Sequence, residues 1–441
     1  MKPLSLKVAQ LEESQTLVFT QKARAMRSAG IDVASLTAGE PDFATPAHIK
    51  MAAIQAIDED FTHYTDNQGT PGLIQAIVRK FATDNDLQFE PEQILVSCGA
   101  KHSIYNVVQA LCNKGDEVVV AAPYWVSYPE IIKMADAKPV IIHATHESHF
   151  KITAVQLRRA INERTKAFIF NSPSNPTGAV YSQGEIEELA DVIQETGVYV
   201  ISDEIYEKII YDGAKHYSIG CIKEIRDQVI TVNGVSKAFA MTGWRLGFAM
   251  GPKWIIGAMQ KLQSQSTSNP TSIVQKAAVA ALNGPQDCIR EMVDAYAARR
   301  KFMVEALAEI EGIECAAPDG AFFGTEAESV YTNTAKPGFL KLEFWPGHPD
   351  LSATPLEVEL LAMSSFLMDY PFAGRLFPGA LAVLQGLGSF GPVVILSDGD
   401  VVFQPRKVER ADRRGVGQRG QRAVGDGAEP DVHAECERDG E

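Results

Sequence analysis

"NGVSKAFAMTGWRLGF" (233–248) places a single lysine, Lys237, among small and apolar residues. The run "QVITV" (228–232) precedes this stretch and "RLGFAM" (245–250) closes it, and both are short apolar runs typical of buried strands. A lysine in an apolar pocket loses favourable hydration of its charged form. Such a lysine can therefore act as a nucleophile that forms a Schiff base. Arg245 follows eight residues later, where a guanidinium would suit phosphate oxygens through two hydrogen bonds.

Short apolar runs of this kind recur from about residue 90 to 255, and helix-period segments such as 102–114 and 184–196 lie between several of them. Apolar runs that alternate with helices indicate parallel strands buried on both faces, and therefore an α/β fold. Ligands bind beyond the carboxyl ends of strands in such sheets, so we expect the chemistry directly after each run. The strand candidates are "QILVSC" (93–98), "DEVVVAA" (116–122), "KPVIIHA" (138–144), "KAFIFN" (166–171), "VYVISD" (198–203), "QVITV" (228–232) and "RLGFAM" (245–250).

Polar residues follow four of these runs, where each strand should pass into a loop. Backbone amides at a helix start form an anion site, so the segment after the first run suits a phosphate. A buried carboxylate such as Asp203 would suit a pyridinium nitrogen. Taken singly, the residues have ordinary explanations as well, because Lys237 could be a surface side chain and Asp203 a helix N-cap. The polar residues are Asn175 in "SPSNPTG", Asp203 and Tyr206 in "DEIYE", Lys237, and Gly99, Ala100 and Lys101 in "GAKHS".

The composition limits the classes of protein to which the chain can belong. A length of 441 residues predicts two or three domains, and the net charge of −15 argues against nucleic acid or an anionic membrane as a partner. The six cysteines form no CxxC pair, which indicates reduced thiols in a cytoplasmic protein. The N-terminus has no apolar signal region, and no window approaches 18 apolar residues, so we expect a soluble, untargeted protein.

Two further segments carry structural predictions. "HATHESH" spaces His143, His146 and His149 three apart, but no cysteine or other ligand cluster accompanies them, so we interpret the segment as a solvated loop and predict no metal. Residues 285–312 have one apolar stripe at helical spacing and end at a glycine, which predicts a long helix joining two domains. Residues 411–441 contain no Leu, Ile, Met, Phe, Tyr or Trp, which predicts disorder.

With these motifs in order, "GVSKAFAMTGWRLG" (234–247) resembles the pyridoxal-phosphate attachment signature of the class I aminotransferases, fold type I. The resemblance runs from about residue 10 to 323 and is strongest to the bacterial aspartate aminotransferase branch. It implies a mostly parallel sheet sandwiched by helices, an amino acid and a 2-oxo acid as substrates, and a homodimer. The other matching pieces are "AGEPDFATP" (38–46), "HYTDNQGTPGL" (63–73), "YWVSYP" (124–129), "NSPSNPTG" (171–178) and "SDEIYE" (202–207).

The resemblance also implies a role for each matching residue. Lys237 would attach pyridoxal 5′-phosphate covalently and then move the substrate's Cα proton, and Asp203 would keep the pyridine nitrogen protonated. Tyr206 and Asn175 would bind the phenolic oxygen, and Trp125 would stack on the ring. Gly99, Ala100, Lys101 and Arg245 would hold the phosphate with Tyr64 of a second subunit, while Gly39, Trp125 and Asn175 would contact the substrate.

The C-terminal third departs from the family. A later strand should supply an arginine for the substrate α-carboxylate, and only Lys341 or Arg375 stands in for it, which predicts weak transamination. Residues of about 350–409 resemble a fragment of a haloacid-dehalogenase-type hydrolase without its nucleophile motif. Two alternatives therefore stay open, namely a chimera that binds the cofactor but turns over poorly and a lyase on the same scaffold. The predicted regions are an N-terminal arm (1–44), a large cofactor-binding domain (45–284), a linking helix and the start of a small domain (285–324), an atypical segment in place of that small domain (325–410) and a tail (411–441).

Overall fold

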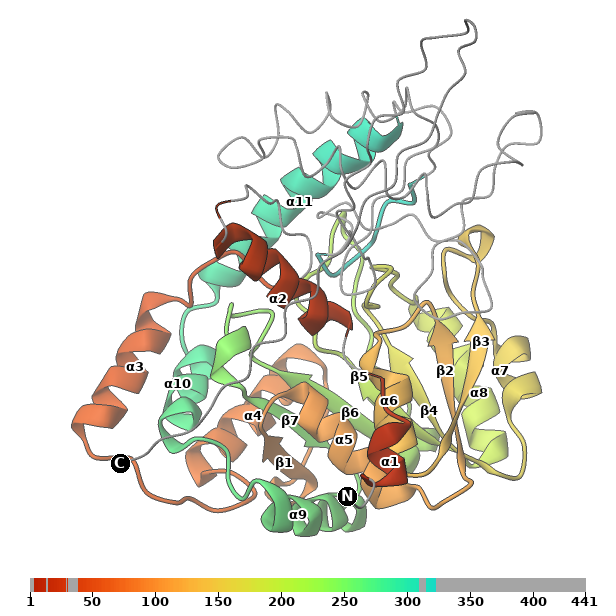
Figure 1. Cartoon of the computed structure of the whole chain (residues 1–441), viewed down its shortest axis with the longest axis horizontal. Coiled ribbons are helices and arrows are strands. Elements are labelled where there is room, and N and C mark those ends of the chain that lie inside the picture. Colours follow the sequence, from red (N-terminus) through yellow and green to blue (C-terminus); the bar gives the residue numbers. More distant parts are fainter. Residues whose placement is uncertain (1–3, 13–14, 29, 31–38, 309–314, 323–441) are drawn as a thin grey trace, which may run out of the picture. The chain divides into compact units, whose positions relative to one another are not determined.

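The computed structural model of the chain describes residues 4–12, 15–28, 30, 39–308 and 315–322, all within the unit Met1–Pro405. These residues are built around one seven-stranded sheet in the order β1-β7-β6-β5-β4-β2-β3 (Figure 1). β7 runs antiparallel to its two neighbours, and all other neighbouring strands are parallel. The strands are β1 (Ile94–Ser97), β2 (Glu117–Ala122), β3 (Lys138–His143), β4 (Thr165–Asn171), β5 (Tyr199–Asp203), β6 (Val229–Gly234) and β7 (Gly247–Met250).

All seven predicted strands form, and the sheet is buried on both faces as expected. Along β2, Val118 and Val120 pack into one core, whereas Val119 between them packs into another. This alternation follows from the two-residue period of a strand, which directs successive side chains to opposite faces. Because both faces meet apolar helices, an uninterrupted apolar run is what such a strand requires.

Helices cover both faces of the sheet (Figure 1). One face carries α5, α6 and α9, and the other carries α7 and α8 near β4 and α3, α4 and α10 near β1 and β7. The α-helices are α1 (Leu6–Ala9), α2 (Gln15–Ser28), α3 (Ala47–Asp58), α4 (Pro71–Asp84), α5 (Ala100–Leu111), α6 (Ser127–Met134), α7 (Ala154–Ala160), α8 (Gln183–Thr196), α9 (Lys253–Ser266), α10 (Ser272–Asn283) and α11 (Asp287–Ala308). The 3-10 helices are η1 (Pro91–Gln93), η2 (His146–Ser148), η3 (Ile219–Cys221), η4 (Lys223–Gln228) and η5 (Thr242–Trp244).

The ends of α8 show how the local sequence sets its limits. The Ser182 hydroxyl accepts a hydrogen bond from the amide of Glu185, and the Glu185 carboxylate accepts one from the amide of Ser182, which forms a capping box. Gly197 ends the helix with φ of 72°, a left-handed conformation that glycine adopts without strain. The predicted helix 285–312 is α11, and residues 309–314 lie outside the described residues.

One expectation needs correction. The strand predicted from Arg245 begins at Gly247 instead, because Arg245 has φ of 55° and ends η5.

The polar segment 263–272 begins inside α9. There Gln263 is fully buried, and its amide nitrogen donates to the carbonyls of Asn67 and Val96 at 3.0 and 2.8 Å. A buried glutamine with satisfied hydrogen bonds is a structural residue.

None of the helices among the described residues is both long and apolar enough to cross a membrane. The domain boundaries predicted from the sequence stay a prediction. The hydrolase-like segment, Lys341 and Arg375 all lie outside the described residues.

Gly247 provides a test of how tightly β7 packs on the start of α5. A Cβ atom there would lie 2.3 Å from the Ala100 nitrogen and 2.5 Å from the Gly99 carbonyl carbon, both rigid backbone. We expect Gly247→Ala to lower the free energy of unfolding by about 1–3 kcal/mol, measured in urea. Gly72→Ala on α4 is the matched control, because its Cβ would meet nothing within 4 Å, and it should change stability by less than about 1 kcal/mol. Equal urea midpoints of unfolding for the two variants would contradict the close approach of β7 to the start of α5.

Candidate active site at the carboxyl edge of the sheet

The parallel strands bring their carboxyl ends to one edge of the sheet. β4 ends at Asn171 and β5 at Asp203, and these two residues are register partners. β6 ends at Gly234, three residues before Lys237. Gly234 pairs with Gly247 of β7, which in turn pairs with Ser97 at the end of β1. Loops far apart in the sequence therefore meet at this edge, as the α/β interpretation predicted.

Asp203 is the buried acid of this edge, with 4% of its surface exposed. The Tyr128 hydroxyl donates to its Oδ2 at 2.7 Å, and the Ile205 amide donates to its Oδ1 at 3.3 Å. Burial raises the pKa of Asp203 to about 6, although the Tyr128 hydrogen bond and the charge of Lys237 oppose the rise. A desolvated carboxyl group of this kind is stabilised in its ionised form by a cation beside it.

Lys237 approaches the same place from the loop after β6. Its Nζ donates to the carbonyl oxygen of Gly39 at 2.5 Å and lies 5.5 Å from the Tyr206 ring centroid and 5.1 Å from that of Phe322. Tyr206 is buried and meets Phe322 edge to face at 5.5 Å. The half-buried ammonium is thus surrounded by two aromatic rings and a carbonyl, and it is close enough to Asp203 to affect the pKa of that acid.

An anion cradle lies at the start of α5. Gly99 caps this helix with φ of 95°, and a Cβ there would come within 2.6 Å of Nη2 of Arg245, so the guanidinium lies directly over the helix start. Its Nη1 donates to the carbonyl of Thr242 at 2.8 Å. Ala100 and Lys101 are the first two residues of the helix, where backbone amides have no carbonyl partner within the helix. Amides and a guanidinium together suit a phosphate.

An aromatic side chain links the cradle to the buried acid. The Lys101 ammonium lies 4.7 Å from the Trp125 ring centroid, and the Trp125 and Tyr128 rings meet edge to face at 5.4 Å. Tyr128 then binds Asp203. On the other side of the acid, Asn171 donates to the Asp203 carbonyl at 2.8 Å and accepts a bond from the Asn175 amide at 2.7 Å.

The structure thus brings ten of the eleven predicted residues to this edge. Tyr64, which was expected to act on the site of a second subunit, is 92% exposed, and its role stays a prediction. Sequence reasoning missed Tyr128, Asn171 and Phe322 as parts of the site. Tyr128 was within reach of the sequence, since it belongs to "YWVSYP" (124–129), but its partner lies 75 residues away. The residues present are Gly39, Gly99, Ala100, Lys101, Trp125, Asn175, Asp203, Tyr206, Lys237 and Arg245.

These groups match the chemistry of pyridoxal phosphate. The lysine can react with an aldehyde, the buried carboxyl group of Asp203 favours a cationic ring nitrogen, and the cradle at Gly99 favours a phosphate. The close approach of Arg245 to Gly99 is specific evidence for this fit, because any side chain at position 99 would displace the guanidinium. The predicted cofactor therefore fits the described residues.

Comparisons with known proteins agree with the site. The sequence model of the family described as aminotransferase class I and II matches residues 31–329. An aspartate aminotransferase of Geobacillus stearothermophilus is 50% identical over 321 residues, which is 73% of this chain and 82% of that protein. An aspartate/prephenate aminotransferase of Nitrosomonas europaea is 48% identical over 322 residues, covering 73% and 81%. Among solved structures, the aspartate aminotransferase from Thermus thermophilus with maleate has a TM-score of 0.70 at 43% identity and covers 73% of this chain and 84% of that chain.

The Tyr128 hydrogen bond gives a testable pH dependence. Tyr128→Phe removes the donor to Oδ2, so the pKa of Asp203 should rise above about 6. Because the ionised acid binds the cationic ring, the pH midpoint of pyridoxal phosphate affinity should move upward by roughly one pH unit. The measurement is an absorbance titration of the cofactor-free protein at several pH values. Tyr181→Phe is the control, because Tyr181 is equally buried but binds the Ile152 amide. An unchanged midpoint in Tyr128→Phe would refute the role of this bond.

Proposed function

The chain belongs to the class I and II aminotransferases, and we propose that aspartate is its amino donor and a 2-oxo acid such as 2-oxoglutarate its acceptor. It is an aminotransferase with pyridoxal 5′-phosphate as cofactor. The observation that supports this reaction best is the pairing of buried Asp203 with Lys237 beside an anion cradle. For aspartate, the support comes from the names of the relatives and from maleate in the Thermus thermophilus structure, since maleate is a four-carbon dicarboxylate like aspartate.

Lys237 is proposed as the catalytic residue. Its Nζ would hold the cofactor covalently and, once freed from it, would take the proton from the substrate Cα. The bound cofactor supplies an electron sink for the bond that breaks at Cα. The Gly39 carbonyl, which accepts the hydrogen bond from Nζ, can hold the freed amine near its working position, and the same backbone is proposed to face the substrate carboxylate.

The remaining residues are proposed to hold the cofactor. Asp203 keeps the ring nitrogen protonated, because separating the two charges in a buried site would cost free energy. Tyr206 and Asn175 are proposed to bind the phenolic oxygen, and Trp125 to stack on the ring. The backbone amides at the start of α5 and the Arg245 guanidinium would hold the phosphate.

A lyase on the same scaffold is the alternative reaction, and product analysis separates the two. We expect the purified protein with pyridoxal phosphate, aspartate and 2-oxoglutarate to form oxaloacetate and glutamate. Lys237→Ala should abolish this, whereas Lys276→Ala should not, because Lys276 lies over the Phe61 ring, outside the residues that make up the site. Release of ammonia without glutamate would favour the lyase.

We expect the conversion of the bound cofactor by saturating aspartate to be slow. Only Lys341 and Arg375 stand in for the carboxylate-binding arginine, and a lysine lacks the bidentate fork. A misaligned substrate loses further rate because the Cα–H bond must line up with the ring system. A single-turnover absorbance measurement tests this, and rapid, complete conversion would show that a suitable cation is present.

We also propose that the protein is a homodimer in which Tyr64 reaches the site of the second subunit. The proposal is supported by apolar exposure on α3, where Met51, Ile54 and Ile57 are 67%, 57% and 50% exposed at a spacing of three residues. A row of exposed apolar side chains on one helix is typical of a contact surface. Tyr64 follows this helix and is itself 92% exposed.

Sedimentation provides the test of the dimer. The double variant Met51→Asp and Ile54→Asp should shift the protein toward monomers, because it would bury two charges without partners. Val155→Asp on α7 is the control, since Val155 is 59% exposed on a different helix. Tyr64→Ala should leave the dimer intact and weaken cofactor binding by about tenfold, the loss of one hydrogen bond to a charged phosphate. A wild-type monomer with fully bound cofactor would contradict the proposal.

A further inference from the structure

The segment "DEIYE" (203–207) contains two glutamates that have no proposed role in binding the cofactor. Glu204 and Glu207 are only 1% and 8% exposed, so they are not surface charges. Ser202 and Glu204 share one face of the strand end, with the Ser202 hydroxyl donating to Oε1 of Glu204 at 2.8 Å. Asp203, between them, faces the site.

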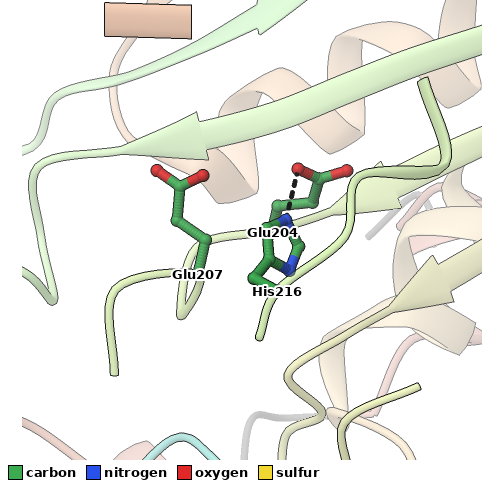
Figure 2. A group of neighbouring side chains, drawn as sticks. All are labelled: Glu204, Glu207 and His216. Carbon is green, nitrogen blue, oxygen red and sulfur yellow. Dashed lines mark hydrogen bonds and ion pairs between the residues drawn. The ribbon is translucent and has the colours of Figure 1, made fainter. Parts of the chain in front are cut away.

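Glu204 is bound from outside its own strand by the segment 216–218. The Ser218 hydroxyl donates to Oε1 at 2.7 Å, and Nε2 of His216 lies 2.9 Å from Oε2. Figure 2 shows the His216 ring against this carboxylate, with Glu207 beside them. Burial lowers the pKa of His216, but the charge and hydrogen bond of Glu204 and the charge of Glu207 outweigh it, so the pKa is raised.

Glu207 is bound by helix α4 and the residue after it. Lys80 forms a buried ion pair with Glu207, and the Asn85 side chain donates to Oε2 at 2.8 Å. The Lys80 ammonium also donates to Oδ1 of Asn85 at 2.7 Å. Burial alone would raise the pKa of Glu207, but Lys80 and His216 lower it to about 2, so this carboxylate stays ionised.

The four charged groups form a closed network. The ligand atoms of Glu204, Glu207 and His216 lie within 4.8 Å of one another, a separation at which a metal ion could bind. Both carboxylates and Nε2 of His216 already have hydrogen-bond or ion-pair partners, whereas Nδ1 of His216 is buried without a hydrogen bond, and Lys80 supplies a positive charge at Glu207. The Lys80 ammonium already balances one of the two carboxylates, and a protonated His216 would balance the other, which would leave no excess charge for a metal to neutralise.

We propose that Glu204 and Glu207 are positioning residues that fix the turn bearing Asp203 and Tyr206, and that the His216–Glu204 pair sets the charge around Asp203. This rests on the proposed roles of Asp203 and Tyr206 in cofactor binding. The order of the residues supports this proposal. Each residue proposed to bind the cofactor, Asp203 or Tyr206, is followed directly by an anchoring glutamate, at position 204 or 207. Each anchor reaches a different part of the chain, so the turn is held at two points.

The charge of Glu204 raises the pKa of Asp203, because two neighbouring carboxylates disfavour each other's ionisation. Around Asp203, the other titratable groups are Tyr128 from α6, Lys237 after β6, and Tyr206. Around the His216–Glu204 pair they are Glu207, Lys80 and Cys221. Removing the Glu204 charge should therefore lower the pKa of Asp203, and removing the His216 charge should raise it.

The experiment measures pyridoxal phosphate affinity of the cofactor-free full chain against pH, by cofactor absorbance and by quenching of tryptophan fluorescence. Glu204→Gln should move the affinity midpoint to lower pH and His216→Gln to higher pH, each by on the order of half a pH unit. Opposite shifts are an electrostatic signature, since a general loss of stability would move both variants in one direction. Glu207→Gln should weaken affinity by about tenfold through the loosened turn.

Glu117→Gln is the matched control. Glu117 is 3% exposed and is held by an asparagine and an arginine, Asn162 and Arg164, but it lies at the first residue of β2, at the opposite end of that strand from the site edge. Glu117→Gln should lower the urea concentration at the midpoint of unfolding without moving the pH midpoint of pyridoxal phosphate affinity. If Glu204→Gln does not fold, His216→Gln decides the matter, because it keeps the carboxylate and a neutral donor.

Shifts in the same direction, no shift, or an equal shift in Glu117→Gln would overturn the proposal. Failure of the proposed cofactor site is distinguishable, because the wild-type chain would then take up no pyridoxal phosphate at all. Uptake by the wild type with variants indistinguishable from the control would refute the positioning role alone.

Discussion

A carboxyl group withdrawn from water at the end of β5 is the constraint on which the rest of the site depends. Asp203 is almost fully buried, and burial raises its pKa to about 6. A buried acid with a raised pKa can bind a cation only if its surroundings stabilise the ionised form. The Tyr128 hydroxyl and the Lys237 ammonium do this from two different elements, and a cationic ring nitrogen would complete it. Catalytic and structural demands therefore meet in one side chain.

The sequence was sufficient to predict the strands of the sheet but not the exact residues at which each strand begins. Every strand could be predicted because apolar runs bounded by turn residues leave a chain of this composition few other ways to bury them. The start of β7 could not, because the apolar run gives no sign of the left-handed conformation with which Arg245 ends η5. The burial of Gln263 could not be predicted either, because its hydrogen-bond partners Asn67 and Val96 lie far from it in the sequence.

The candidate site also contains residues that could be predicted from the sequence and residues that could not. Residues that lie at this edge because they follow a strand, such as Asp203 and Lys237, could be placed there from their order in the sequence. The hydrogen bond between Tyr128 and Asp203 could not be predicted, because it forms only through the packing of α6 on the sheet. His216 carries no local signal either, and its partner Glu204 lies in a different segment. Contacts between elements, rather than residue types, are what a single sequence conceals.

The turn after β5 explains why function and stability are linked in this chain. The two-residue period of a strand separates Asp203 from Glu204, and the following turn returns Tyr206 to the first side and Glu207 to the second. One side carries groups that gain from a cofactor, and the other carries buried charges that need Lys80 and His216. Breaking a buried ion pair leaves an uncompensated charge and costs about 3–5 kcal/mol, a large part of the stability of a typical domain. The environment of Asp203 can therefore change only within limits that the buried network allows.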